Sequence, residues 1–125
     1  MTDYHSIRAL SGPAVGGDGA ATATTSTSES IFGEIVSVAL KPIHPDDTPL
    51  PVGSVATLIA LGDDGFPDQT ILNAVAITTD GVIVYPYHEP DTGYFARYFH
   101  DGRFSLMIDD TNADHEVEAK ISFKR

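Results

Sequence analysis

The side chains best suited to chemistry are the oxygen-bearing residues of DDTNADHE, residues 109–116. They alternate along the segment, as oxygen ligands do at the start of an EF-hand calcium loop. The four alternating residues are Asp110, Asn112, Asp114 and Glu116. The match then breaks, because His115 occupies the position that needs Gly and Ile121 the position that needs a bidentate Glu. The alternative is an acidic loop stabilised by hydrogen bonds from Asp and Asn side chains. We therefore expect no metal site and keep the four residues as calcium candidates.

No other group of residues specifies a reaction. The five histidines form neither an HxH pair nor an i, i+4 pair: His5, His44, His88, His100 and His115. Cys is absent, and no G-x-S-x-G nucleophile turn is present. Glu89 and Asp91 flank a proline on one turn, without the apolar surroundings that would raise a carboxyl pKa for acid catalysis. We expect a protein that is not an enzyme and has no cofactor.

A cluster of aromatic residues is the most informative feature of the second half of the chain. Its members are Tyr85, Tyr87, Tyr94, Phe95, Tyr98 and Phe99. One interpretation is cross-strand packing within a hairpin. The other is an exposed surface that binds a protein partner or a sugar, since Tyr is enriched at interfaces. A sugar platform usually includes Trp, which this chain lacks.

These residues belong to a series of short, β-branched segments separated by turns rich in Gly, Pro and Asp. The expected strands are 31–41, 54–61, 69–79, 82–87, 94–99, 103–108 and 116–124. Both parities of 31–41 are apolar, so we expect that strand to be covered on both faces. Residues 42–53 contain four prolines and are expected to form a stiff surface connection.

Two of these segments carry more detailed predictions. Asp80-Gly81 between two β-branched runs predicts a hairpin. In 116–124, alternation places Val117, Ala119, Ile121 and Phe123 on the inner face. No window has the periodicity of an amphipathic helix. The sequence predicts an all-β fold, a single β-sandwich or small barrel of about six to eight antiparallel strands.

The overall composition excludes several classes of partner. Among 125 residues, 18 are acidic and 7 are basic, giving a formal charge of −11. Such a chain repels nucleic acids and anionic membranes, so we expect neither as a partner. The N-terminus does not have the pattern of a signal peptide, and no apolar run is as long as a membrane span. We expect synthesis in a cytoplasm.

The first thirty residues differ from the rest. Fifteen of the nineteen residues in GPAVGGDGAATATTSTSES, residues 12–30, are Gly, Ala, Ser or Thr. Such a segment buries too little apolar surface to offset the entropy of ordering, so a linker is its default interpretation. Its small side chains would also let an extended backbone lie against a neighbouring surface. We therefore predict an extended N-terminal arm over 1–30 and a β-sandwich domain over 31–125.

The order of these features resembles small all-β accessory virion proteins of tailed bacteriophages. The resemblance lies in FGEIVSVALKP, VATLIALGDDGFPDQTILNAVAITTDG and VIVYPYHEPDTG, which precede an aromatic strand. It implies a structural subunit that decorates the capsid or sits at the head–tail junction or tail. It also implies a virion location and partners that are other virion proteins or copies of the same chain. The alternative is a module that binds carbohydrate or another ligand, with or without calcium.

For a structural subunit the expected contacts come from the arm, the Pro-rich connection 42–53 and the aromatic segment 85–99. For a ligand-binding module they come from the aromatic segment, with or without calcium at 109–116. The candidate partner-binding residues are Tyr4, Ile7, Leu10, Val15, Tyr85, Tyr87, Tyr94 and Tyr98. If the arm serves as a tether, deleting 1–30 should weaken assembly and leave the domain folded.

Overall fold

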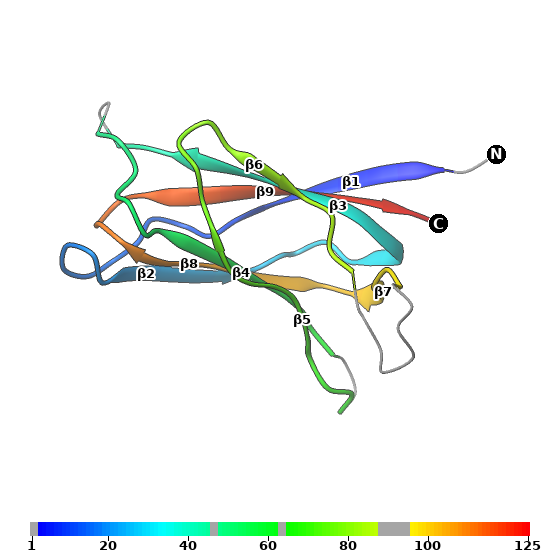
Figure 1. The fold of residues 1–125 in the computed structure, drawn as a ribbon. Helices are drawn as coiled ribbons and strands as arrows, with labels where there is room; N and C mark the ends of the chain where they lie inside the picture. The colour runs from blue at the N-terminus through cyan, green and yellow to red at the C-terminus, as the bar shows by residue number, and fades with distance from the viewer. Residues whose placement is uncertain (1–2, 46–47, 63–64, 88–95) are drawn as a thin grey trace.

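The computed structural model describes residues 3–45, 48–62, 65–87 and 96–125, which form nine strands in two antiparallel sheets (Figure 1). The first sheet has the order β1 (Tyr4–Leu10), β9 (Glu116–Lys124), β3 (Ile31–Ile43) and β6 (Val82–Val84), and β7 (Phe99–Gly102) also pairs with β3. The second has the order β2 (Ala21–Ser26), β8 (Phe104–Thr111), β4 (Val55–Ala60) and β5 (Gln69–Ala76). The prediction of an all-β sandwich is confirmed; the sheets do not close into a barrel.

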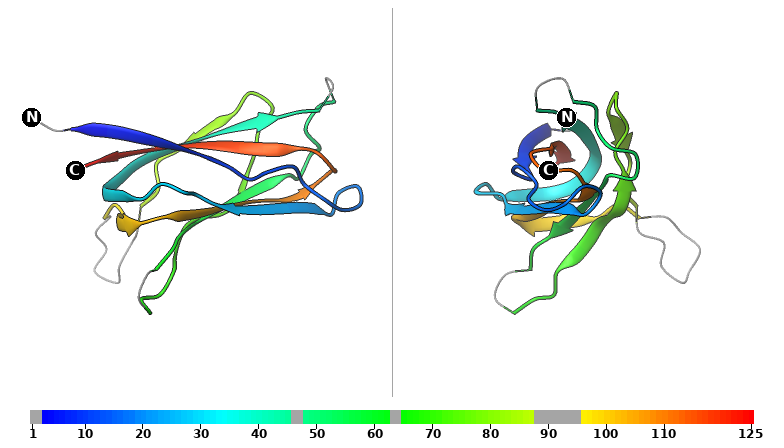
Figure 2. Two further views of the ribbon diagram at one scale, coloured as in Figure 1. Left: turned by 180° about the vertical axis from the view of Figure 1, so that it is seen from behind. Right: turned by 90° about the vertical axis from the view of Figure 1, so that its left-hand side faces the viewer.

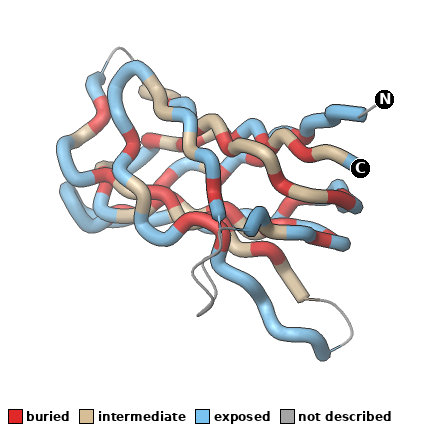
Figure 3. The backbone as a smooth tube through the Cα atoms, turned by 45° about the vertical axis from the view of Figure 1, so that its right-hand side comes forward, coloured by how far each residue is buried: buried red, intermediate tan, exposed pale blue. Residues whose placement is uncertain are grey.

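The core lies between the two sheets, where buried and less buried residues alternate along β4, β8 and β9 (Figure 3). In β9 the four side chains predicted to face inward are all buried. Phe104, Leu106 and Ile108 of β8 and Leu58 of β4 face them from the second sheet, and none has exposed surface. The strict alternation of β9 follows from its position between β1 and β3, with one face on the core and one in solvent.

A bulge in β3 explains why both parities of this strand are apolar. Ile31 and Ile35 are buried before the bulge and Val38 and Leu40 after it, and the pairing with β9 shifts between Ile35 and Ser37. One extra residue at this point moves the inward-facing set to the other parity. The expectation that β3 is covered on both faces is therefore wrong: one face is in the core, and the other is the outer side of the first sheet.

The N-terminal thirty residues form part of the sandwich. β1 pairs with β9 along its whole length, and β2 pairs with β8. Residues 11–20, here called the crossing segment, pass from the first sheet to the second (Figure 2). Ser11 and Ala14 in this segment are buried. The structure therefore differs from the expected arm: β1 and β2 are edge strands of the same domain, and the fold has no boundary at residue 30.

Two further expectations fail locally. β5 and β6 do not form a hairpin, because β5 pairs with β4 in the second sheet and β6 pairs with β3 in the first. The Asp80-Gly81 turn does form: Gly81 N donates to Thr78 O (3.0 Å), and Gly81 has φ of 86°. The turn connects β5 in the second sheet to β6 in the first, because the edge of β3 is free to pair with β6. Pro42, expected in a connection, extends β3 opposite Val117, beyond the last residue that β6 pairs.

Candidate interaction surface

Two exposed phenylalanines lie on the outer side of the first sheet. Phe32 in β3 and Phe99 in β7 are 56% and 57% exposed. Their ring centroids are 5.1 Å apart, in an edge-to-face arrangement. The pairing of β3 with β7 places Phe99 opposite Glu34, which lies two residues after Phe32 and on the same side of the sheet. Both rings therefore point away from the core. The contact shields only part of each ring, and a large apolar area stays in water.

Two tyrosines continue this exposed area beyond β6. Tyr85 and Tyr87 are 66% and 58% exposed. Together with Pro86, Ala96 and Arg97 they line an open pocket of about 440 Å³. The Arg97 guanidinium lies 3.7 Å from the Glu34 carboxylate, which connects this pocket to the phenylalanine pair. We call Phe32, Phe99, Tyr85 and Tyr87 the aromatic surface.

The outer side of the first sheet is also the least acidic part of the described chain. Strand parity places four basic and four acidic residues on it: Arg8, Lys41, Lys120 and Lys124, with Glu34, Asp101, Glu116 and Glu118. Two loop residues of opposite charge border it, Arg97 beside Glu34 and Asp80 in a pocket with Lys41, so the charges on this side balance. Since the whole chain carries −11, the remaining surface is strongly acidic.

The structure separates the residues expected to bind partners into two groups. Tyr85 and Tyr87 lie together at one edge of the first sheet, whereas Tyr4 and Leu10 are exposed on β1 at the other edge. Val15 is exposed on the crossing segment, where it forms a bridge with Thr22. Ile7 is buried in the core, so it is not exposed to a partner. Tyr98 is partly buried and packs against the core; Tyr94 lies outside the described residues. Phe32 was not predicted as a contact residue. It directly follows the core residue Ile31 in the strand and so points to the opposite face, which could have identified it.

The acidic turn between β8 and β9 contacts the crossing segment. The Asn112 side-chain oxygen accepts a hydrogen bond from Gly19 N (2.8 Å), and Asp114 N donates to Ala14 O (2.8 Å). Asp110 and Asp114 are exposed, and Glu116 begins β9. The described residues contain no cluster of three or more His, Asp or Glu side chains arranged to hold a metal ion. Of the four calcium candidates, Asn112 thus uses its oxygen within the fold.

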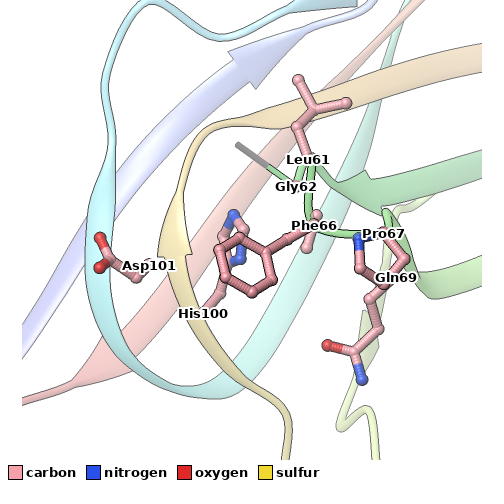
Figure 4. A pocket seen from close by; sticks show the side chains of 8 residues that line it. Leu61, Gly62, Phe66, Pro67, Gln69, His100 and Asp101 are labelled. Atoms are coloured by element: carbon pink, nitrogen blue, oxygen red, sulfur yellow. The ribbon is translucent and has the colours of Figure 1, made fainter. Parts of the chain in front are cut away.

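A second pocket, also about 440 Å³, opens between the ends of β4 and β7 (Figure 4). His100 lines it, and its Nε2 lies 2.8 Å from Arg103 O; because a carbonyl only accepts, we assign the proton to Nε2. Asp101 follows on the same strand and points to the opposite side, away from the imidazole (Figure 4). The described lining contains no Ser, Thr, Cys or Lys. It therefore offers one imidazole without a nucleophile or an orienting carboxylate.

At the opposite end of the sandwich, His44 and His115 lie side by side, with ring centroids 5.9 Å apart. His115 is 1% exposed. Burial lowers the pKa of His115, the neighbouring His44 lowers it further, and the Asp114 carboxylate acts in the other direction. His115 is therefore neutral at neutral pH.

Comparison with known proteins gives only weak structural similarities at low sequence identity. No family model matches the chain, and no curated protein matches it. Among solved structures, FlhE has a TM-score of 0.46 at 10% identity over 98% of both chains. A structure of infectious bursal disease virus, Gx strain, has a TM-score of 0.48 at 12% identity over 99% of this chain and 33% of that one. A CBM4 structure has a TM-score of 0.39 at 11% identity over 99% and 84%. The described residues form no helix that could cross a membrane.

Proposed function

We propose that the protein is a non-enzymatic structural subunit of a bacteriophage virion, a capsid decoration or head–tail accessory protein, and that the aromatic surface joins it to neighbouring subunits. The observation that carries the proposal is the exposure of Phe32 and Phe99 in mutual contact beside Tyr85 and Tyr87. Exposed aromatic groups of this size are characteristic of protein–protein contacts, where Tyr and Phe are enriched.

The charge distribution also favours the outer side of the first sheet as the contact surface. Two copies of a chain with charge −11 repel each other over most of their surfaces. The outer side of the first sheet, on which basic and acidic residues balance, reduces that repulsion. The partners are therefore copies of the same chain or other virion proteins, which meet this side through the aromatic surface. β1 pairs with β9, and the crossing segment bonds the turn at 112–115, so both make their contacts within the fold.

The experiment compares assembly of three proteins by electron microscopy and size-exclusion chromatography with light scattering. Wild type should form oligomers or bind particles, and the double variant Phe32→Ser, Phe99→Ser should shift to monomer with an unchanged melting temperature. Phe66→Ser is the matched control, because Phe66 is 75% exposed and lies outside the aromatic surface. A monomeric wild type that binds no particle, or a double variant that assembles like wild type, would refute the proposal.

The second candidate function is carbohydrate binding, favoured by the pocket between Tyr85, Tyr87 and Arg97. Aromatic rings that stack on a sugar and a guanidinium that donates hydrogen bonds are the groups such a site needs. In this case Tyr85→Ala should abolish binding in a glycan titration. A calcium-assisted version predicts a higher melting temperature on adding Ca²⁺, lost in Asp110→Ala with Asp114→Ala. An unchanged melting temperature removes calcium from the proposal.

A further inference from the structure

His44 and His115 face each other where the pairing of β3 with β9 ends. Ile43 and Glu116 form the last paired position, and the two histidines follow it on either side. Their ring planes are 78° apart. The contact is therefore fixed by the strand register, because the two residues extend a ladder that both strands already hold in place.

The polar atoms of this pair lack partners within the fold. In the part of the chain that the structure describes, three buried side-chain atoms have no hydrogen-bond partner: His44 Nδ1, His115 Nδ1 and Thr111 Oγ1. All three belong to residues beside the β8–β9 turn or the end of β3. A buried imidazole without a partner is tolerated when neutral, whereas its protonated form is a buried charge that strongly disfavours this arrangement.

The backbone around His115 holds the crossing segment. His115 O accepts a hydrogen bond from Ala14 N (2.9 Å), and Asp114 N donates to Ala14 O (2.8 Å). Gly19 N donates to the Asn112 side chain (2.8 Å). Every one of these bonds joins the turn at 112–115 to the crossing segment, so a shift of His115 disturbs all of them together.

We propose that the His44–His115 pair is an acid-sensitive clasp. When both imidazoles are neutral, the turn at 112–115 holds the crossing segment against the sandwich. When the pair takes up a proton, the charged ring draws water into this end of the core, and the crossing segment detaches from the turn. The proposal stands whether or not the protein is a virion subunit.

The charged groups around the pair set the direction of the effect. Among the described residues, the groups that act on His115 are His44, which opposes its protonation, and the Asp114 carboxylate, which favours it. The net result is a pKa of His115 below its ordinary value of 6.5. The unfolded or opened state therefore binds the proton first as the pH falls below about 6.5, and stability is lost from there downward. Carboxylates with ordinary pKa values near 4 stay ionised above about pH 5, which leaves the histidines to dominate this window.

The test is hydrogen exchange at the amides of Ala14, Gly19 and Asp114, measured from pH 7.5 to 5.5 and corrected for intrinsic exchange rates. Below about pH 6.5 the opening constant of wild type should rise about tenfold per pH unit for each proton taken up. His115→Asn should have a slope lower by one proton. His5→Gln is the control, because His5 is exposed at the other end of β1, where it stacks on Phe123. It should keep the wild-type slope.

If His115→Asn does not fold, His44→Gln tests the same idea, because His44 is only half-buried. Removing the repulsion from His44 should make His115 easier to protonate in the closed state and reduce the slope. Equal slopes in wild type and in the folded variant would overturn the proposal. So would exchange that rises equally in all strands. Stabilisation by Zn²⁺ at pH 7.5 that is lost in either variant would assign the pair to metal binding instead.

Discussion

Replacing Ser11 by Ala tests whether the N-terminal residues are part of the sandwich or a separable arm. Ser11 has no exposed surface. Its Oγ accepts a hydrogen bond from Val117 N and donates one to Gly12 O, both 3.0 Å long. Its backbone N donates to Val117 O (3.0 Å). A single serine thus closes the ladder between the start of the crossing segment and β9.

The magnitude follows from the atom that loses its partner. Alanine cannot accept a hydrogen bond from Val117 N, which belongs to a fully buried residue. An unsatisfied buried donor costs about 1–3 kcal/mol. For a domain of this size each kcal/mol lowers Tm by about 3–6 °C, so Ser11→Ala should melt roughly 3–18 °C below wild type.

Ser6→Ala is the matched control, because Ser6 lies on β1 with an exposed side chain on the outer side of the same sheet. It should stay within about 0.5 kcal/mol of wild type. The assay is chemical and thermal unfolding followed by circular dichroism, with all three proteins at one concentration. If Ser11→Ala unfolds at the same denaturant concentration as Ser6→Ala, the Ser11 side chain does not stabilise the fold, and the reasoning is refuted.

Three further predictions concern the core, a turn and a surface ion pair. Phe104→Ala should lose about 3–5 kcal/mol of unfolding free energy, measured in urea, because Phe104 is fully buried between the sheets. Gly81→Ala should lose at least about 1 kcal/mol, since φ is +86° and a Cβ would lie 2.9 Å from Leu40 O; an unchanged denaturation midpoint would contradict the turn geometry. Arg8→Ala should cost less than about 1 kcal/mol despite the 3.0 Å contact with Glu118, because the Arg8 side chain is 66% exposed. That loss should shrink further in 1 M salt.

Strands that pair with another strand on both edges were the most predictable from sequence. β9 has its predicted bounds and inner face because it lies between β1 and β3, so alternation of core and solvent is the dominant constraint. β3 was located correctly, but its bulge was hidden, because an inserted residue such as Val36 merely makes both parities apolar. Periodicity identifies a strand more readily than it identifies a defect within one.

Residues 1–30 could not be predicted from composition, because their contribution to the fold is made by the backbone. Small side chains at Ala14 and Ala21 bury little area, yet both residues lie in the core. The amides of this stretch complete the free edges of β8 and β9. A prediction based on the buried area of side chains leaves out this backbone pairing and therefore favours a linker. Thr and Ala in alternation, as in ATATTS, also suit an edge strand with one face on a core.

The Asp80-Gly81 turn shows the limit of a local signal. The dipeptide fixes the reversal of the chain, which the structure contains, but it does not choose the strand that the following residues pair with. That choice depends on which edges are free. β5 pairs with β4, and β3 is thirteen residues long, so its edge at Val38–Leu40 is open to β6. Edge availability is a property of the whole topology, and no short segment encodes it.

The same topology changes which part of the chain is available to a partner. The N-terminal segment, expected to contact neighbours, contacts its own β8 and β9. The aromatic residues, for which core packing was one of two interpretations, divide: Tyr98 packs against the core, while Tyr85, Tyr87 and Phe99 stay exposed and Phe32 joins them. A partner would thus dock near the edge of the first sheet opposite to β1, on the side with the least negative charge. Deleting residues 1–30 would then remove two strands of the sandwich, so a loss of assembly in that deletion would report unfolding. Only substitutions within the aromatic surface can separate docking from folding.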